Sequence, residues 1–111
     1  YALRVRSAAL QAGVELSFYE AITAVAFIGF QDKGLDWAVM EVGLGGRLDA
    51  SNVVSRPRVT AIVSIDFDHM HILGGTLDAI AREKAGIVKD EAPLVTGLLP
   101  DPAFRAIAEI A

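Results

Sequence analysis

Residues 59–86, VTAIVSIDFDHMHILGGTLDAIAREKAG, decide the fold. The apolar run 59–65 predicts a strand that is buried on both faces of a parallel sheet. A polar loop, 66–75, follows and holds both histidines of the chain. Thr76 is a residue type that caps helices, so a helix is predicted over 77–85, with Gly86 at its end.

The same alternation continues on both sides of this segment. Residues 93–96 predict a short strand, and Asp101 and Pro102 predict the cap and first position of a last helix that runs to the end of the chain. Upstream, the nearly continuous apolar run 36–42 predicts another buried strand. It leads into a loop that contains three glycines within residues 43–46.

Two helices are predicted before that strand. The first covers residues 1–12 and ends at Gly13, and the second covers residues 18–32. Ser17 and Glu20 have the spacing of a capping box, in which each side chain bonds the other residue's backbone amide. The complete order predicts an α/β fold with a mainly parallel sheet flanked by helices.

The composition narrows the class of protein. The chain has 111 residues, of which 53% are hydrophobic and 22% charged, and this balance excludes a disordered segment. Its net charge of −4 argues against nucleic acid as a partner. The longest apolar stretch, 21–30, is shorter than the ~18–20 residues that span a bilayer, so no membrane segment is expected. The absence of cysteine fits a reducing, cytoplasmic location.

The length allows at most one domain. The chain begins at Tyr1 and stops within an apolar helical pattern. We therefore expect residues 1–111 to be a single partial domain cut from a larger protein.

The chemistry is expected in the two loops that follow the predicted strands, because ligands collect beyond the carboxyl ends of parallel strands. Glu41 closes the first strand. Its carboxylate suits a hard cation such as Mg²⁺, or it caps backbone amides of the glycine-containing loop. Arg47 suits a carboxylate or phosphate, or it pairs with Asp49.

The second loop holds Asp66, Asp68, His69 and His71 within six residues. Imidazoles and carboxylates together form a common set of divalent-metal ligands. The alternative is a solvated loop in which the aspartates make turn hydrogen bonds. Lys84 lies among apolar residues of the following helix; it is either a surface lysine with a covered stem or an amine held near the metal.

Several segments together resemble one family. They are LSFYEAITAVAF (16–27), EVGLGGRLDASN (41–52), SIDFDHMHILGGTLDAIAREKAGIV (64–88) and PLVTG (93–97). In this order and at these distances they resemble the bifunctional folylpolyglutamate synthase/dihydrofolate synthase enzymes of the Mur ligase superfamily. The resemblance implies a segment of a P-loop NTPase-like central domain.

The resemblance also implies an activity. Family members are ATP-dependent carboxylate–amine ligases that add L-glutamate to folate or dihydropteroate through an acyl phosphate, with Mg²⁺ at the nucleotide phosphates. By resemblance, Glu41 and His69 bind Mg²⁺. Lys84, in REKAG, matches a catalytic lysine that is carbamylated in the family. The sequence leaves open whether the substrate is folate or dihydropteroate.

By resemblance, the loop residues Arg47, Asp49 and Asn52 lie near the active site and contact substrate. Two positions qualify the match. Ser51 stands where the family usually has threonine, and His71 is not a family ligand.

The phosphate-binding string G-x-x-G-K-[ST] does not occur in the chain. We therefore expect the chain to lack ligase activity by itself, and its open sheet edges would allow it to dimerise. Two alternatives remain: a metal-dependent hydrolase that uses the Asp/His loop, and a noncatalytic α/β module.

Overall fold

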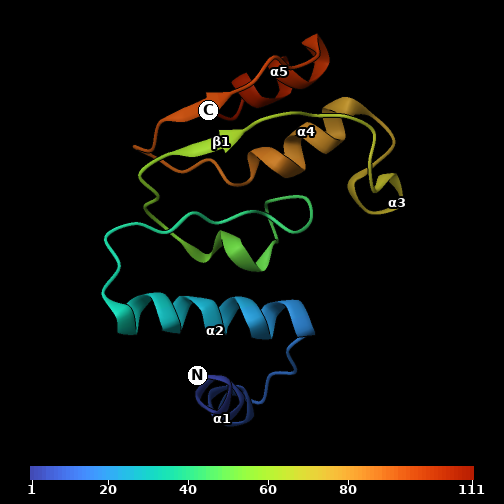
Figure 1. Ribbon diagram of the computed structural model, residues 1–111. Coiled ribbons are helices and arrows are strands. Elements are labelled where there is room, and N and C mark those ends of the chain that lie inside the picture. The colour runs from blue at the N-terminus through green and yellow to red at the C-terminus, as the bar shows by residue number, and fades with distance from the viewer. The chain divides into compact units, whose positions relative to one another are not determined.

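The computed structural model describes residues 1–111, which form two compact units, residues 1–41 and residues 42–111. The elements are α1 (Ala2–Ala12), α2 (Phe18–Lys33), the 3₁₀ helix η1 (Ala50–Val53), β1 (Thr60–Ile62), α3 (Met70–Leu73), α4 (Leu77–Ala85), β2 (Leu94–Thr96) and α5 (Asp101–Ala108), most of which are labelled in Figure 1. No helix combines the length and the apolar character needed to cross a membrane. The expectation of one partial domain stays a prediction.

The first unit consists of the two predicted helices. Both end at glycines in the left-handed region, Gly13 at φ 65° and Gly34 at φ 61°, where residues with a Cβ are disfavoured. The capping box is confirmed: the Glu20 amide donates to the Ser17 hydroxyl at 3.2 Å, and the Ser17 amide donates to the Glu20 carboxylate at 2.7 Å. Local sequence signals therefore place both helices correctly.

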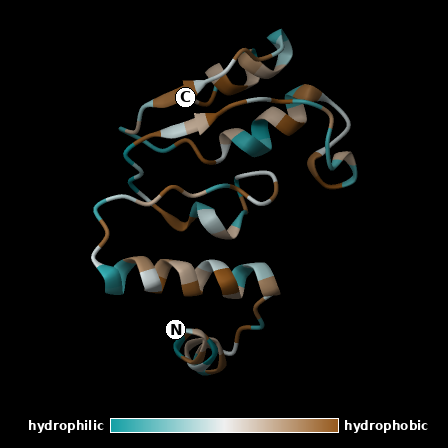
Figure 2. Ribbon diagram, in the orientation of Figure 1, coloured by the Kyte–Doolittle hydropathy of each residue, from teal (hydrophilic) through white to brown (hydrophobic).

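Contacts between α1 and α2 hold this unit together. Val5 is buried, and Arg4 forms an ion pair with Asp32 at 2.6 Å. Figure 2 shows that α2 is hydrophobic along most of its length. Its apolar side chains are nevertheless mostly half-buried, so this pair of helices encloses only a small interior.

The strand predicted over residues 36–42 is wrong. These residues form no regular element, and the Trp37 and Val39 side chains are 71% and 95% exposed. A strand exists only when a neighbouring strand accepts and donates its backbone hydrogen bonds. The apolar run identifies residues suited to a sheet, but in this structure no neighbour pairs with them.

The second unit confirms the α/β class. β1 and β2 pair in parallel, with Thr60 opposite Leu94 and Ile62 opposite Thr96. The chain between them includes α4, so the pair is joined by a helical crossover, as parallel strands require. Figure 1 shows α4 and α5 beside this two-stranded sheet.

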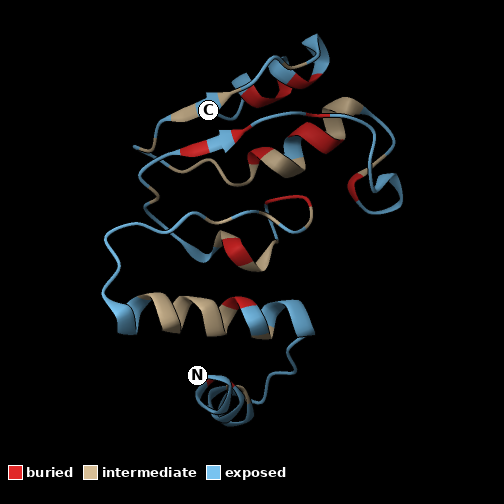
Figure 3. Ribbon diagram, viewed as in Figure 1, coloured by how far each residue is buried: buried red, intermediate tan, exposed pale blue.

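One hydrophobic core lies between the strands and these helices. Its buried residues, coloured red in Figure 3, are Ile62, Ile65, Leu73, Ile80, Ala81, Ala85, Ala103, Ala106 and Ile107. The alanines on both helices let α4 and α5 approach closely, and Ile80 and Ile107 fill the space that remains. This packing fixes α4, and with it the position of the backbone at Lys84.

The sheet is covered on one face only, which differs from the prediction. β1 is three residues long and alternates buried, exposed, buried, whereas the run 59–65 predicts burial on both faces. Val63 is 77% exposed and Val95 is 56% exposed. A continuous apolar run therefore shows that both faces of a strand are suited to burial. It does not show that both faces are covered in this structure.

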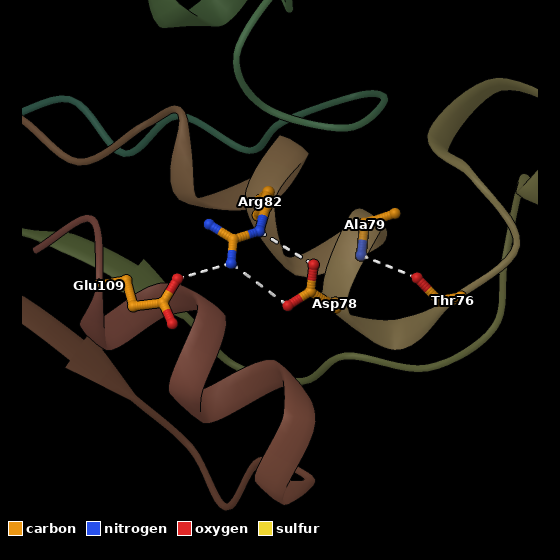
Figure 4. A network of polar contacts seen from close by, with 5 residues as sticks. All are labelled: Thr76, Asp78, Ala79, Arg82 and Glu109. Atoms are coloured by element: carbon orange, nitrogen blue, oxygen red, sulfur yellow. Dashed lines mark hydrogen bonds and ion pairs between the residues drawn. The ribbon is translucent and has the colours of Figure 1, made fainter.

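The predicted start of α4 is confirmed and that of α5 is shifted. Thr76 accepts a hydrogen bond from the Ala79 amide at 3.1 Å (Figure 4). Pro100, rather than Asp101, is the residue before the first turn of α5, and this helix ends at Ala108. The loop 66–75 also contains the short helix α3, which the sequence did not indicate.

Arg82 joins α4 to the end of α5. Its guanidinium bonds Asp78 at 2.9 Å on the same helix and Glu109 at 2.6 Å beyond α5 (Figure 4). Both ion pairs are exposed and therefore contribute little to stability. They supplement the packing of the buried Ile80 and Ile107.

Gly97 provides a test of how tightly β2 ends against β1. Its amide donates to the Ile62 carbonyl at 3.1 Å, and a Cβ at Gly97 would lie 2.1 Å from the Val63 carbonyl oxygen. We expect Gly97→Ala to lower the free energy of unfolding by about 1–3 kcal/mol, measured by urea denaturation. Gly75→Ala is the control, because no atom lies within 4 Å of that Cβ position. Equal losses in the two variants would contradict this explanation.

Candidate active site around the glycine loop

The glycine loop, defined as residues 43–49, lies against the C-terminal end of α4. The Arg47 amide donates to the Glu83 carbonyl at 2.9 Å. At Gly46, an added Cβ would lie 2.8 Å from the Lys84 carbonyl oxygen and 2.9 Å from that of Glu83. The last carbonyls of a helix lack partners within the helix, so the loop satisfies one of them and needs a glycine to come this close.

An ion pair reinforces this contact. The Arg47 Nε lies 3.2 Å from each carboxylate oxygen of Glu83, and Nη2 lies 3.0 Å from Oε1. The expectation that Arg47 pairs with Asp49 is therefore wrong. Glu83 is half-buried beneath this contact and is not a freely solvated charge.

Gly86 is the other point of close approach. It ends α4 as predicted, but with φ −60° it does not adopt the left-handed conformation usual for such a glycine. A Cβ there would lie 2.3 Å from the Cβ of Arg47. A side chain is excluded at this position because the glycine loop occupies the space.

Asn52, in η1, connects both segments. Its side-chain nitrogen donates to the Gly86 carbonyl at 3.0 Å and to the Arg47 carbonyl at 3.1 Å. One amide group thus bonds the end of α4 and the glycine loop at the same time. Both of its donors are used within the protein.

Asp49 folds the glycine loop. Its Oδ2 accepts hydrogen bonds from the amides of Gly43 at 3.0 Å and Leu44 at 2.9 Å. Its Oδ1 accepts from the Ser51 amide at 2.8 Å and from the Ser51 hydroxyl at 2.6 Å. The alternative for Glu41, that its carboxylate caps these loop amides, is therefore wrong, since Asp49 does so.

The hydrogen bonds also set the ionisation of Asp49. Partial burial by itself would raise the pKa of this carboxyl group. The hydrogen bonds from Ser51, Leu44 and Gly43 favour the charged form, and together they hold the pKa below its ordinary value of 3.8.

The second loop places His69 at the start of α3. Its backbone has φ 47°, in the left-handed region, and its amide donates to the Asp68 carboxylate at 2.7 Å. The His69 side chain is half-exposed, and its ring centroid lies 6.3 Å from that of His71. Asp66 accepts from the Phe67 amide, as expected for a turn.

The Asp/His loop does not form a metal-binding cage. No three His, Asp or Glu side chains of the chain are grouped so that they could hold a metal ion. A hydrolytic metal centre usually has three protein ligands. The hydrolase hypothesis therefore lacks its ligand set.

Lys84 lies at the edge of the buried face of α4. Its neighbours on that face, Ile80, Ala81 and Ala85, are fully buried, whereas Lys84 is half-buried. Glu41 is exposed and belongs to the first unit, while His69 and Lys84 belong to the second. That these three side chains meet at one ion stays a prediction.

Sequence reasoning missed Glu83 and Gly86 as partners of the glycine loop. Arg47 and Glu83 are 36 positions apart, so no local spacing links them. The sequence indicates the glycines of the loop, but their contacts with the end of α4 arise only in the tertiary structure.

Known proteins match the chain closely, although no protein-family model matches it. The dihydrofolate synthase/folylpolyglutamate synthase of Bacillus subtilis is 47% identical over 90 residues, which is 80% of this chain. A solved FPGS–AMPPCP–folate complex has a TM-score of 0.87 at 40% identity, covering 95% of this chain and 25% of that one. The E. coli FolC complex with DHPP and ADP has a TM-score of 0.82 at 41% identity, covering 88% and 23%.

The chain belongs to the folylpolyglutamate synthase/dihydrofolate synthase family. The resemblance drawn from the motifs is therefore confirmed. This family member spans 21% of the length of its Bacillus subtilis relative, so it corresponds to one part of such a protein.

Acid should release the glycine loop of this family member. Because the pKa of Asp49 is lowered in the folded state, its stabilising contribution is present above pH 3.8 and is lost as the pH falls through the lowered value. We expect the amide NMR signals of Leu44 and Ser51 to shift together with a midpoint below 3.8. In Asp49→Asn this transition should be absent, whereas Asp101→Asn should retain it. A midpoint above 3.8 would contradict the assignment.

Proposed function

We propose that this chain is part of an ATP-dependent ligase that adds L-glutamate to folate or dihydropteroate. The observation that carries the proposal is the close match, over most of the chain, to proteins named for that activity. Solved relatives were obtained with nucleotides and with folate or DHPP, which supports ATP and a pterin-containing substrate here.

The proposed reaction has two steps. The substrate carboxylate attacks the γ-phosphorus of ATP, forming an acyl phosphate and releasing ADP. The amine of L-glutamate then attacks the acyl carbon, so that the C–N bond forms, phosphate leaves and a proton is lost. Catalysis of such a transfer depends mainly on positioning and on neutralising phosphate charge.

Glu41 and His69 are the residues proposed to hold Mg²⁺, which would supply that neutralising charge. Mg²⁺ keeps several waters and takes one or two protein carboxylates together with substrate phosphates. The chain's small donor set suits such a site better than a cage of protein ligands.

Lys84 is proposed to act in a carbamylated form. Its neutral amine would attack the carbon of CO₂ and lose a proton, which gives a carbamate whose single negative charge is shared by two oxygens. This change supplies a carboxylate-like group, and it explains why a lysine would lie at a cation site.

Arg47, Asp49 and Asn52 remain predicted substrate contacts. Their polar groups already bond within the protein, to Glu83, to the amides of the glycine loop and to Gly86 respectively. A direct contact with substrate would therefore have to use donor or acceptor atoms of these side chains that these hydrogen bonds do not occupy.

The first test is activity with and without the rest of the enzyme. The sequence contains no G-x-x-G-K-[ST] string to cradle the phosphates, so the 111-residue chain should show no glutamate- and ATP-dependent ligation. A hybrid enzyme, in which this chain replaces the matching segment of the Bacillus subtilis relative, should be active in an ADP-release assay. Ligation by the chain unaided would refute the first expectation, and an inactive, folded hybrid would refute the proposed function.

The two neighbouring histidines separate the ligase from the hydrolase. In the hybrid enzyme, His69→Ala should lower kcat by about 100-fold or more, because phosphate charge is no longer neutralised. His71→Ala is the matched control and should remain within about threefold of the unaltered hybrid. Equal losses in both variants would instead favour a site that uses both rings.

The dimer expected through open sheet edges also stays a prediction, as does the cytoplasmic location. β1 and β2 form a sheet of two strands, so each strand has an edge without a neighbour. The exposed Val63 and Val95 add apolar surface next to these edges, which supports association. Sedimentation of the 111-residue chain should show a dimer that Val63→Lys weakens. A monomer at all concentrations would contradict this expectation.

A further inference from the structure

We propose that Arg47, Asn52, Glu83 and Gly86 form a brace that positions Lys84 by fixing the end of α4 to the glycine loop. The inference rests on the proposed function, because it assigns these residues to the proposed role of Lys84. It gives Arg47 and Asn52 a positioning role, through α4, in addition to any contact with substrate.

The contacts of the brace enclose Lys84 along the chain. Glu83, directly before it, accepts the Arg47 amide through its carbonyl and the Arg47 guanidinium through its carboxylate. Gly86, two residues after it, offers its carbonyl to the Asn52 side chain at 3.0 Å. The backbone before Lys84 is therefore bonded to the glycine loop, and the backbone after it is bonded to Asn52, whose side chain also bonds the Arg47 carbonyl in that loop.

The place of Lys84 in α4 explains why a brace is needed. The helix ends at Ala85, one residue later, and the last turn of a helix has carbonyls without intrahelical partners. Such ends fray unless something outside the helix holds them. Catalysis tolerates little movement of a reacting or charge-bearing group, so a lysine at a free helix end would be poorly placed.

Close packing makes the brace rigid. Gly46 and Gly86 are the two positions where a Cβ would collide with the opposite segment, at 2.8 Å from the Lys84 carbonyl and 2.3 Å from the Arg47 Cβ. The Gly46 backbone therefore packs on the carbonyls of Glu83 and Lys84, and the Gly86 backbone packs on the Cα and Cβ of Arg47. A shift of the glycine loop would have to move the backbone of Lys84 with it.

A contribution to global stability is the weaker explanation of these contacts. The Arg47 side chain is 56% exposed, and exposed ion pairs contribute little to the stability of a fold. Arg82 on the same helix is a natural comparison: it also forms exposed ion pairs, with Asp78 and Glu109, but none with the loop. The two arginines separate a positioning role from a stabilising one.

The test uses the hybrid enzyme and a charge exchange. Arg47→Glu and Glu83→Arg should each lower kcat about 10- to 100-fold, with the KM for ATP within about threefold, because Lys84 is misplaced rather than ATP binding lost. The double variant restores the pair in reverse and should recover most of kcat. Asn52→Asp, which turns two donors into an acceptor facing two carbonyls, should behave like the single variants. Arg82→Met should leave kcat within about threefold.

Amide hydrogen exchange in the 111-residue chain tests the brace without any activity. The Arg47 amide should exchange slowly, and about 10-fold faster in Asn52→Asp, while the Ala79 amide at the other end of α4 is unchanged. Unprotected Arg47 in the unaltered chain would overturn the brace itself. An active hybrid in which the single variants keep full kcat would overturn the positioning role alone. An inactive unaltered hybrid would instead count against the proposed function.

Discussion

The docking of the glycine loop on the end of α4 is the constraint on which the rest of the second unit depends. It begins with one backbone hydrogen bond, from the Arg47 amide to the Glu83 carbonyl. At the end of α4 that carbonyl also accepts a longer bond, from the Gly86 amide at 3.4 Å, and the shorter bond from the loop adds a second donor where helix ends lack partners. Because the approach brings two backbones into contact, it also requires glycine at positions 46 and 86. The ion pair between Arg47 and Glu83 and the hydrogen bonds of the Asn52 side chain reinforce this backbone contact.

The charged side chains of Arg47, Asp49 and Glu83 form hydrogen bonds that hold the glycine loop and the end of α4 in place. Asp49 accepts hydrogen bonds from the amides of Gly43, Leu44 and Ser51 and from the Ser51 hydroxyl. These bonds favour its ionised form and keep the loop folded. Lys84 differs, since it is half-buried at the edge of an otherwise buried helix face. The proposed carbamate at Lys84 follows from the match of its segment, REKAG, to the family.

Similarity to known enzymes and the local geometry answer different questions. The family membership rests on identity spread along most of the chain, and it makes a ligase the natural proposal. It does not explain why Asn52 or Glu83 is present. Their hydrogen bonds do, because they connect the loop to α4 at the residues that flank Lys84. The hydrogen bonds therefore give a physical reason for the residue types at positions 52 and 83, which similarity to relatives does not supply.

The sequence alone indicates α1, α2, α4 and α5, the caps of α2 and α4, the parallel strands β1 and β2, and the family. The capping box, the glycines at helix ends and the apolar runs involve residues close together in the chain. These signals can therefore be read without knowing which distant segments pack against them. The failures share one cause. The run 36–42 predicts a strand, and the run 59–65 predicts burial on both faces. Both predictions are wrong because pairing and burial need a neighbour that is distant in the sequence, and no local pattern identifies it. The same reason explains why Arg47 pairs with Glu83 and not with Asp49. Arg47 and Glu83 are 36 positions apart, and only the tertiary structure brings the glycine loop against α4.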